Sequence, residues 1–323
     1  MKKILFGVIC FLTFFISVNA LENLAPNSKS SILLETSTGK ILYESNSHEK
    51  LPPASMTKIM SMLLIMEAID NNKLSFDSDV LISENAASMG GSQIFLEAGE
   101  TYKVKDLLKG IAIASGNDAV VAMAEKVGGT VENFVNMMNE KAKSLGLKDT
   151  VFKNPHGLDT EGHYSSAYDM AMIAKELLKH EKILEYTSIY EDYLKKNDGS
   201  STWLVNTNKL VRFYDGVDGL KTGFTSSAKY CVTTTAKKSN MRLLSVVMGA
   251  ETSDLRSKDT TNLLNYGFNT YKLDLIMSKT KILGNVKVEK GKKDNVDLVL
   301  KEDATSLKKI NDKSTDYFVN LKV

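Results

Sequence analysis

Ser55 and Lys58 place a hydroxyl and an amine three residues apart, at the start of a predicted helix over residues 55–69. This spacing puts both side chains on one face of the helix. A serine becomes a nucleophile when a neighbouring base takes its proton, and a lysine can be that base when burial or a second cation keeps it uncharged. The spacing also occurs elsewhere, for example at Ser278 and Lys281, and taken alone it is better explained by a solvated helix start.

Two further segments carry polar side chains beside glycine. Ser115-Gly116-Asn117 lies in a joint between helical segments and could present a second hydroxyl and an amide to a pocket. Lys221-Thr222-Gly223 lies at the edge of a predicted strand, where the lysine could meet an anion and Gly223 would let a substrate backbone come close. Either segment alone could be an ordinary turn, so the order and separation of all three segments give the signal its specificity.

The surrounding pattern predicts an α+β fold with a helical insertion. Strand-like runs lie near both ends of this part of the chain, and helix-like spacing fills the middle, so N-terminal and C-terminal strands must pair in one antiparallel sheet flanked by helices. The predicted strands cover residues 31–35, 40–44, 217–220, 230–235 and 243–248, and the further helical segments cover 104–127, 130–144, 166–180 and 254–266.

Composition and charge exclude several protein classes. Hydrophobic residues make up 43% and charged residues 25% of the 323 residues, which argues against a disordered or multi-spanning chain. The formal net charge is +2, and Lys2 and Lys3 supply both of those charges. Because the rest of the chain is neutral, nothing indicates a nucleic-acid partner or binding to an anionic membrane surface.

Residues 1–20 have the pattern of a secretory signal peptide. Two lysines precede an apolar run of about 13 residues, which is shorter than the roughly 20 that a membrane span needs, and small residues precede a predicted cut after Ala20. Cys10 would leave with the leader, and Cys231 alone cannot form an intramolecular disulfide. We therefore expect an exported protein, outside the cytoplasmic membrane, with no stable membrane anchor after cleavage.

The chain is expected to divide into two parts after the leader. Residues 21–272 would form the catalytic domain, and residues 273–323 a short β-rich module. In the second part, valines and leucines alternate with charged residues, as in half-exposed strands.

Ser-x-x-Lys, Ser-x-Asn and Lys-Thr-Gly in this order resemble the signature of penicillin-binding proteins and serine β-lactamases. More narrowly, the chain resembles the low-molecular-mass D-alanyl-D-alanine carboxypeptidases from about Ala25 to Tyr271. The stretches that carry this resemblance are residues 52–60, 114–119, 154–158, 164–171 and 216–225.

The resemblance implies a reaction through an acyl-enzyme. Ser55 would attack the carbonyl between two terminal D-alanines of a peptidoglycan stem peptide, with Lys58 as base and Ser115 relaying a proton to the leaving amine. The backbone N–H groups of Ser55 and Phe224 would form the oxyanion hole. Water would then hydrolyse the ester, and β-lactams would inhibit by forming a similar, slowly hydrolysed ester.

The resemblance also implies a substrate-binding set and needs no cofactor or metal. Asn117 would bind the substrate amide, while Lys221 and Thr222 would hold the terminal carboxylate together with Arg256. Phe224 stands where some family members have histidine, and Lys229 stands where glycine is expected before Cys231. His156 and His163 could suggest a metal pair, but the spacing of a zinc peptidase is absent and structural roles are favoured.

Two other functions are compatible with the same residues. A serine β-lactamase would need a deacylating glutamate, and the closest match to its context is residues 132–136, which follow Asn117 too soon along the chain. A non-catalytic cell-wall sensor that keeps the pocket would preserve the same residues without turning over a substrate.

Overall fold

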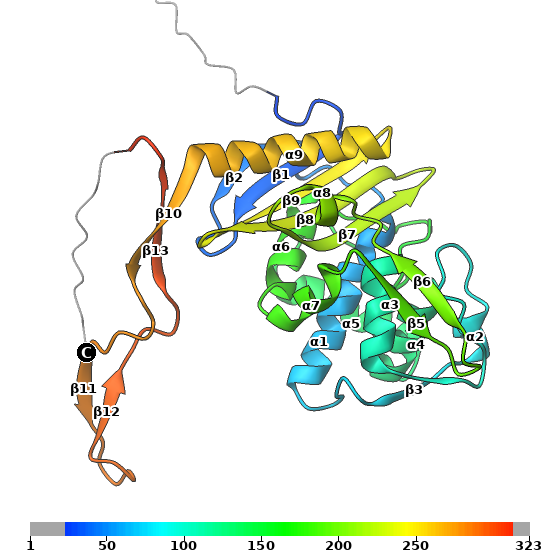
Figure 1. The fold of residues 1–323 in the computed structure, drawn as a ribbon, viewed down its shortest axis with the longest axis horizontal. Coiled ribbons are helices and arrows are strands. Elements are labelled where there is room, and N and C mark those ends of the chain that lie inside the picture. Colours follow the sequence, from blue (N-terminus) through cyan, green and yellow to red (C-terminus); the bar gives the residue numbers. More distant parts are fainter. Residues whose placement is uncertain (1–22, 313–323) are drawn as a thin grey trace, which may run out of the picture.

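The computed structural model describes residues 23–312, so the expected leader and residues 313–323 lie outside the described part of the chain. At its centre is one five-stranded antiparallel sheet (Figure 1). Its strands, in spatial order, are β2 (Ile41–Ser45), β1 (Ser30–Glu35), β9 (Met241–Ala250), β8 (Lys229–Lys238) and β7 (Val217–Thr225).

The sheet closes through pairing of β1 with β9, which come from opposite ends of the predicted domain. Leu33 lies opposite Ser245, and the antiparallel register runs the length of β1. This confirms the predicted pairing of N-terminal with C-terminal strands. It also brings β7, the edge strand with Lys221, into the same sheet as the start of the chain.

Hydrophobic clusters cover both faces of the sheet, which explains why most residues of β9 are apolar. Leu243 and Val247 face one hydrophobic cluster, whereas Leu244 and Val246 face another, since successive side chains of a strand point to opposite faces. The long helix α9 (Ser253–Thr270) covers the first face, and helix α6 (Ala167–Leu177) packs on the second (Figure 1).

The helical layer holds the first two predicted functional segments. The Ser55 segment is a 3₁₀ turn, η1, followed by helix α1, and the predicted helical run over 104–127 is broken in two at Ser115 and Gly116. The larger elements of this layer are η1 (Ala54–Thr57), α1 (Lys58–Asp70), α3 (Val104–Ala114), α4 (Asn117–Gly128), α5 (Val131–Ser144) and α6 (Ala167–Leu177).

Smaller elements fill the gaps between these helices. The hairpin of β5 and β6 lies against α3, and sequence patterns did not predict it as a pair of strands. Only Leu194 and Leu204 of this hairpin are buried, so its alternation is weak. These elements are β3 (Asp79–Leu81), α2 (Glu84–Ala87), β4 (Thr101–Lys103), η2 (Glu181–Ile183), α7 (Leu184–Thr187), β5 (Glu191–Lys195), β6 (Ser201–Val205) and α8 (Leu210–Phe213).

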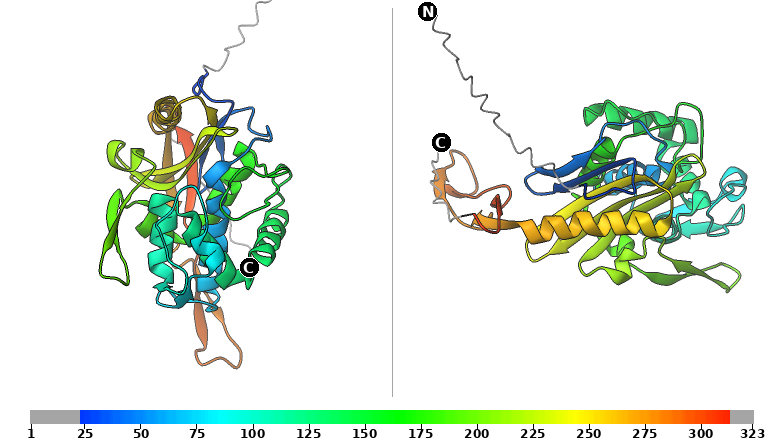
Figure 2. Two further views of the ribbon diagram at one scale, coloured as in Figure 1. Left: turned by 90° about the vertical axis from the view of Figure 1, so that its right-hand side faces the viewer. Right: turned by 90° about the horizontal axis from the view of Figure 1, so that it is seen from above.

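After α9 the chain forms two small two-stranded sheets that extend away from the central sheet (Figure 2). Leu273 is the one buried hydrophobic side chain among the described residues 271–312. These strands are β10 (Tyr271–Met277), β11 (Gly284–Lys287), β12 (Asn295–Leu298) and β13 (Ala304–Lys309). Within residues 23–312, no helix is both long enough and apolar enough to cross a membrane.

Candidate active site

Lys58 lies at the centre of the candidate site and contacts three oxygen atoms. Its Nζ is 2.9 Å from Ser55 Oγ, 2.7 Å from Asn117 Oδ1 and 2.8 Å from the backbone oxygen of His156. The Lys58 side chain is fully buried. The structure thus brings Ser55 within hydrogen-bond reach of Lys58 and joins both to the Ser-x-Asn segment.

The environment of Lys58 favours the neutral amine. Burial, and secondly the charge of Lys221, hold the pKa of the Lys58 amine well below its usual range, against a smaller opposing effect of Asp118. A neutral amine has two hydrogens and one lone pair. Because the oxygens of Asn117 and His156 can only accept, the two hydrogens go to them and the lone pair is left for the Ser55 hydroxyl.

The Asn117 side chain is fixed on both sides. Its Nδ2 donates to the backbone oxygen of Gly90 at 2.7 Å, which leaves Oδ1 directed at Lys58. The helix α4 that begins at Asn117 is held by the buried Asp118 carboxylate, which accepts backbone N–H groups of Ile94 and Leu96. The amide that orients Lys58 is therefore anchored to the loop before α3.

Ser115 takes an unusual backbone conformation. It caps α3 with φ of 64°, in the left-handed region that few residues other than glycine adopt. Its hydroxyl is buried and has no hydrogen-bond partner in the described part of the chain. Since Ser115 lines the same cleft as Ser55, this hydroxyl is available to a bound ligand.

The loop over residues 154–163 supports the Ser55 segment from behind, and spacing in the sequence did not predict this role. Gly157 has φ of +90°, and a side chain on it would place Cβ 1.9 Å from the Ala54 backbone oxygen. His163 Nε2 lies 2.8 Å from Thr57 Oγ1, while its Nδ1 accepts the Lys153 N–H. The loop therefore packs directly against the turn that carries Ser55.

The two histidines of this loop are neutral structural groups in the fold. Burial is the main cause that lowers the pKa of His156 to about 3 and that of His163 to about 4. Within residues 23–312, no group of three or more histidine, cysteine, aspartate or glutamate side chains could hold a metal ion.

Strand β7 brings the Lys-Thr-Gly segment to the other side of Ser55. Lys221 is buried with its Nζ donating to the Thr222 oxygen at 3.0 Å, and burial, followed by the charge of Arg256, lowers the pKa of Lys221 to about 7. Gly223 lines the same cleft as Ser55, and its predicted approach to a substrate backbone stays a prediction. A Cβ on Gly223 would lie 2.8 Å from the Pro53 oxygen and 3.1 Å from the Ser55 nitrogen, so Gly223 also lets β7 pack closely against the turn that carries Ser55.

A cleft of about 350 Å³ joins these segments. Arg256, buried at the start of α9, reaches it with an Nε that has no partner among the described residues. Phe224 is half exposed at its rim, with its ring centroid 4.4 Å from that of Tyr230. The cleft is lined by Ser55, Ser92, Ser115, Thr207, Lys209, Thr222, Gly223, Phe224, Tyr230, Ser253 and Arg256.

Several of these lining residues were not singled out from the sequence. Thr207 accepts a 2.7 Å hydrogen bond from the Thr222 hydroxyl, and Lys209 and Ser92 reach the cleft from loops. No local spacing marks them, because each comes from a connection whose position depends on the finished fold.

Lys229 occupies the position where glycine was expected, and the turn forms nevertheless. Its φ is 58°, which explains why glycine suits this position, and its amine pairs with Glu251 at 3.4 Å. Cys231 beyond it is buried in β8, and burial raises the pKa of its thiol to about 11. This cysteine is therefore a core residue and a poor nucleophile.

Comparison with known proteins agrees with this geometry. The family model described as D-alanyl-D-alanine carboxypeptidase matches residues 17–252. The chain belongs to this family of serine peptidases. It is 54% identical over 302 residues to the D-alanyl-D-alanine carboxypeptidase DacF of Bacillus subtilis, a match that covers 94% of this chain and 78% of that protein.

Solved structures show the same fold. Penicillin binding protein 5 of Haemophilus influenzae has a TM-score of 0.77 and 33% identity, over 88% of this chain and 83% of that one. Penicillin-Binding Protein D2 of Listeria monocytogenes, solved in an ampicillin-bound form, has a TM-score of 0.64 and 32% identity, over 75% of this chain and 98% of that one. The protein is thus a serine peptidase with the fold of the low-molecular-mass penicillin-binding proteins, as predicted.

Proposed function

We propose that Ser55 is the nucleophile of a D-alanyl-D-alanine carboxypeptidase and that Lys58 is its base. The observation that carries this proposal is the lone pair of Lys58, which the fixed acceptors on Asn117 and His156 leave for the Ser55 hydroxyl at 2.9 Å. Lys58 takes the hydroxyl proton as the Ser55 oxygen attacks the carbonyl carbon of the penultimate D-alanine.

The backbone N–H groups of Ser55 and Phe224 bind the oxyanion that forms on that carbonyl. The contact between Gly223 and the Ser55 nitrogen supports this role, because it places the strand leading to Phe224 against the nucleophile turn. The C–N bond then breaks, and the leaving amine receives the proton through the unpartnered Ser115 hydroxyl. Water hydrolyses the resulting ester, which releases the shortened stem peptide and restores the Ser55 hydroxyl.

Lys221, Thr222 and Arg256 bind the terminal carboxylate of the substrate. Arg256 lines the cleft, and Lys221 lies close enough for the charge of Arg256 to lower its pKa, so two neighbouring cations favour an anionic group here. The unsatisfied Arg256 Nε is a donor without another partner in the described residues. Asn117 uses one Nδ2 hydrogen for Gly90 and keeps the second for the amide of the substrate.

The cleft favours a peptidase over a β-lactamase. No carboxylate lines the cleft in the described part of the chain, and Glu132, the closest sequence match to a deacylating glutamate, is exposed on α5. β-Lactams would therefore acylate Ser55, and the resulting ester would be hydrolysed slowly. The ampicillin-bound form of the Listeria protein supports such inhibition here.

The remaining parts of the chain fit an exported enzyme of the cell wall. We infer that residues 1–20 direct secretion, that residues 21–272 form the catalytic domain and that residues 273–323 form a separate β-rich module. The substrate lies outside the cytoplasmic membrane, where trimming of stem peptides in peptidoglycan biosynthesis contributes to cell shape.

Release of free D-alanine from a diacylated tripeptide ending in D-Ala-D-Ala tests the proposed function. We expect release by the wild-type protein, none by Ser55→Ala, and much slower turnover of a chromogenic cephalosporin. Faster cephalosporin turnover would identify a β-lactamase. Acylation by penicillin without D-alanine release would identify a sensor.

A further inference from the structure

The turn that carries Ser55, here called the nucleophile turn, lies between two backbone segments, the loop over residues 154–163 and strand β7. Each of these two segments, here called walls, approaches the turn closely at a glycine. On one side, Gly157 leaves no room for a Cβ beside the Ala54 oxygen, and on the other, Gly223 lies against Pro53 and the Ser55 nitrogen. Ala54 itself has φ of 47°, a left-handed conformation that costs an alanine energy and that surrounding contacts must maintain. The position of Ser55 therefore depends on how far apart these two walls stand.

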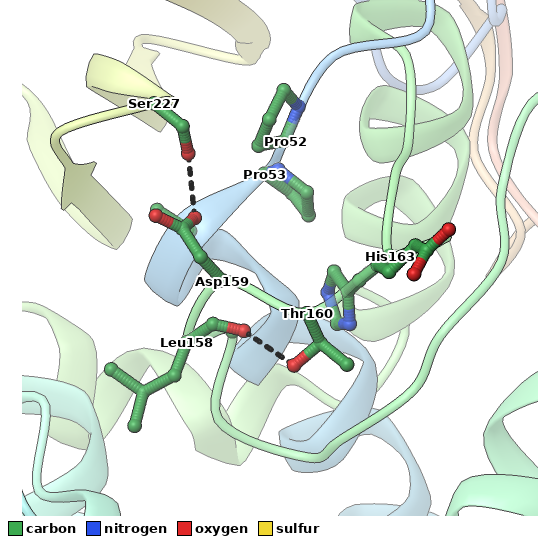
Figure 3. A pocket seen from close by; sticks show the side chains of 10 residues that line it. Pro52, Pro53, Leu158, Asp159, Thr160, His163 and Ser227 are labelled. Atoms are coloured by element: carbon green, nitrogen blue, oxygen red, sulfur yellow. Dashed lines mark hydrogen bonds between the residues drawn. The ribbon is translucent and has the colours of Figure 1, made fainter.

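One carboxylate joins the two walls. Asp159, two residues after Gly157, accepts hydrogen bonds from Thr225 Oγ1 at 2.8 Å and from Ser227 Oγ at 2.7 Å. Thr225 is the last residue of β7, two residues after Gly223. Figure 3 shows Asp159 reaching from its loop to Ser227, in a pocket of about 290 Å³ that Pro52 and Pro53 also line.

We propose that Asp159 is a positioning residue for acylation, which acts by holding β7 and the loop over residues 154–163 together around the nucleophile turn. This inference rests on the proposed role of Ser55. The hydrogen bonds of Asp159 to Thr225 and Ser227 are here called the clasp. The clasp would fix the distance between the two oxyanion donors, because the Ser55 N–H lies on the turn and the Phe224 N–H lies on β7. The same loop also supplies the His156 oxygen to Lys58.

The clasp has a specific kinetic signature. Release of β7 would separate the two oxyanion donors, and displacement of a reacting group by about 1 Å can cost on the order of 100-fold in rate. The loss would fall on the acylation rate constant, because Asp159 holds only the end of β7 at Thr225, whereas Lys221 stays paired with Thr233 in the sheet and Arg256 lies on α9. A carboxylate that touched the substrate would instead change KM.

The test compares acylation of the full-length protein by fluorescent penicillin and cleavage of the D-Ala-D-Ala peptide in matched variants. We expect Asp159→Ala to lower the acylation rate and kcat by about 10- to 100-fold with KM nearly unchanged. Asp159→Asn keeps an oxygen acceptor for both hydroxyls and should recover most of the activity. Glu161→Ala removes a neighbouring carboxylate of the same pocket and should behave as wild type.

A double-mutant cycle completes the test. The pair Thr225→Val and Ser227→Ala removes the same bonds from the other wall, so adding Asp159→Ala to it should cause little further loss. Additive losses, a change confined to KM, or wild-type acylation by Asp159→Ala would overturn the clasp. Failure of the wild type itself to be acylated would instead contradict the proposed function, so the two failures are distinguishable.

Discussion

The cleft and the C-terminal strands differ in how the chain uses buried groups. Around the cleft, Lys58 of α1 and Lys221 of β7 are both buried, and each amine is hydrogen-bonded to oxygen. In the described residues 271–312, Leu273 is the one buried hydrophobic side chain, and lysines alternate with half-exposed valines and leucines. This difference shows that the Ser-x-x-Lys spacing acquires its chemistry from burial of the lysine, because Ser278 and Lys281 have the same spacing but the Lys281 side chain is exposed.

The largest expected effect on acylation comes from replacing the lysine in each of the two Ser-x-x-Lys spacings. Lys58→Ala should reduce acylation of Ser55 by about 1000-fold or more, because the hydroxyl loses its base. Lys281→Ala, the matched change in the exposed copy, should leave acylation unchanged. Rates of fluorescent penicillin labelling measure both, and an equal effect of the two substitutions would refute the importance of burial.

Glycine-to-alanine substitutions compare the backbone packing around the cleft with that of the C-terminal strands. Gly157→Ala introduces a Cβ 1.9 Å from the Ala54 oxygen at a φ of +90°, so we expect a loss of more than about 2 kcal/mol in stability together with slower acylation. Gly146→Ala, at a φ of +73° with open space around it, should cost about 1 kcal/mol and leave acylation intact.

Gly284→Ala, in open space at the start of β11, provides the control from the C-terminal strands and should change neither quantity. Urea unfolding of all three variants supplies the free energies. Equal losses for Gly157 and Gly146 would show that the contact with Ala54 is unimportant.

The pH dependence tests the charge of the second buried lysine. The pKa of Lys221 is lowered to about 7, so this cation loses its proton as the pH rises through that value, and binding of the substrate carboxylate weakens. We expect kcat/KM for the peptide to fall above pH about 7 in the wild type. Lys221→Arg keeps its charge and should lack this alkaline decline, whatever its absolute rate.

A decline of equal midpoint in Lys221→Arg would assign the titration to another group. The acid limb of the profile has a different origin, because Lys58 must be neutral to accept the Ser55 proton. Protonation of Lys58 as the pH falls should therefore slow acylation of the peptide and of penicillin alike.

The smallest effect on chemistry is expected from removal of the C-terminal strands. A chain that ends at Lys272 should keep its acylation rate within about twofold. It loses the burial of Leu273, worth about 1.5–3 kcal/mol, and the bond from Asn240 to the Leu273 oxygen, so its Tm should fall by several degrees. Loss of acylation in a still-folded truncated protein would show that the two parts are one functional unit.

The sheet and the three polar segments around Ser55, Ser115 and Lys221 could be predicted from the sequence, because these features are local or periodic. The alternating and continuous apolar runs of β1, β8 and β9 indicated strands buried in one sheet. The Gly-containing joint at Ser115-Gly116-Asn117 was recognised, although the helical spacing over 104–127 predicted one segment and the structure divides it into α3 and α4. The hairpin of β5 and β6 was missed because its outer face is polar and aromatic while few inward positions are apolar.

The supporting atoms of the site could not be predicted from spacing. The partner of Lys58 on the loop is a backbone oxygen of His156, and the conformation of Ala54 depends on contacts from residues that lie about 100 and 170 positions away in the chain. Gly223 was predicted to allow a close approach to a substrate backbone, and its additional packing against η1 becomes visible only when β7 and η1 are brought together. Such contacts depend on tertiary structure and leave no periodic trace.

The position of the acyl adduct tests the central claim most directly. Full-length protein incubated with a penicillin, digested with a protease and measured by mass spectrometry should carry one penicilloyl group, on the peptide that contains Ser55. The adduct should be absent from Lys58→Ala at short times, since the hydroxyl then lacks its base. An adduct on Ser115 or on any other residue, with Ser55 unmodified, would contradict the account.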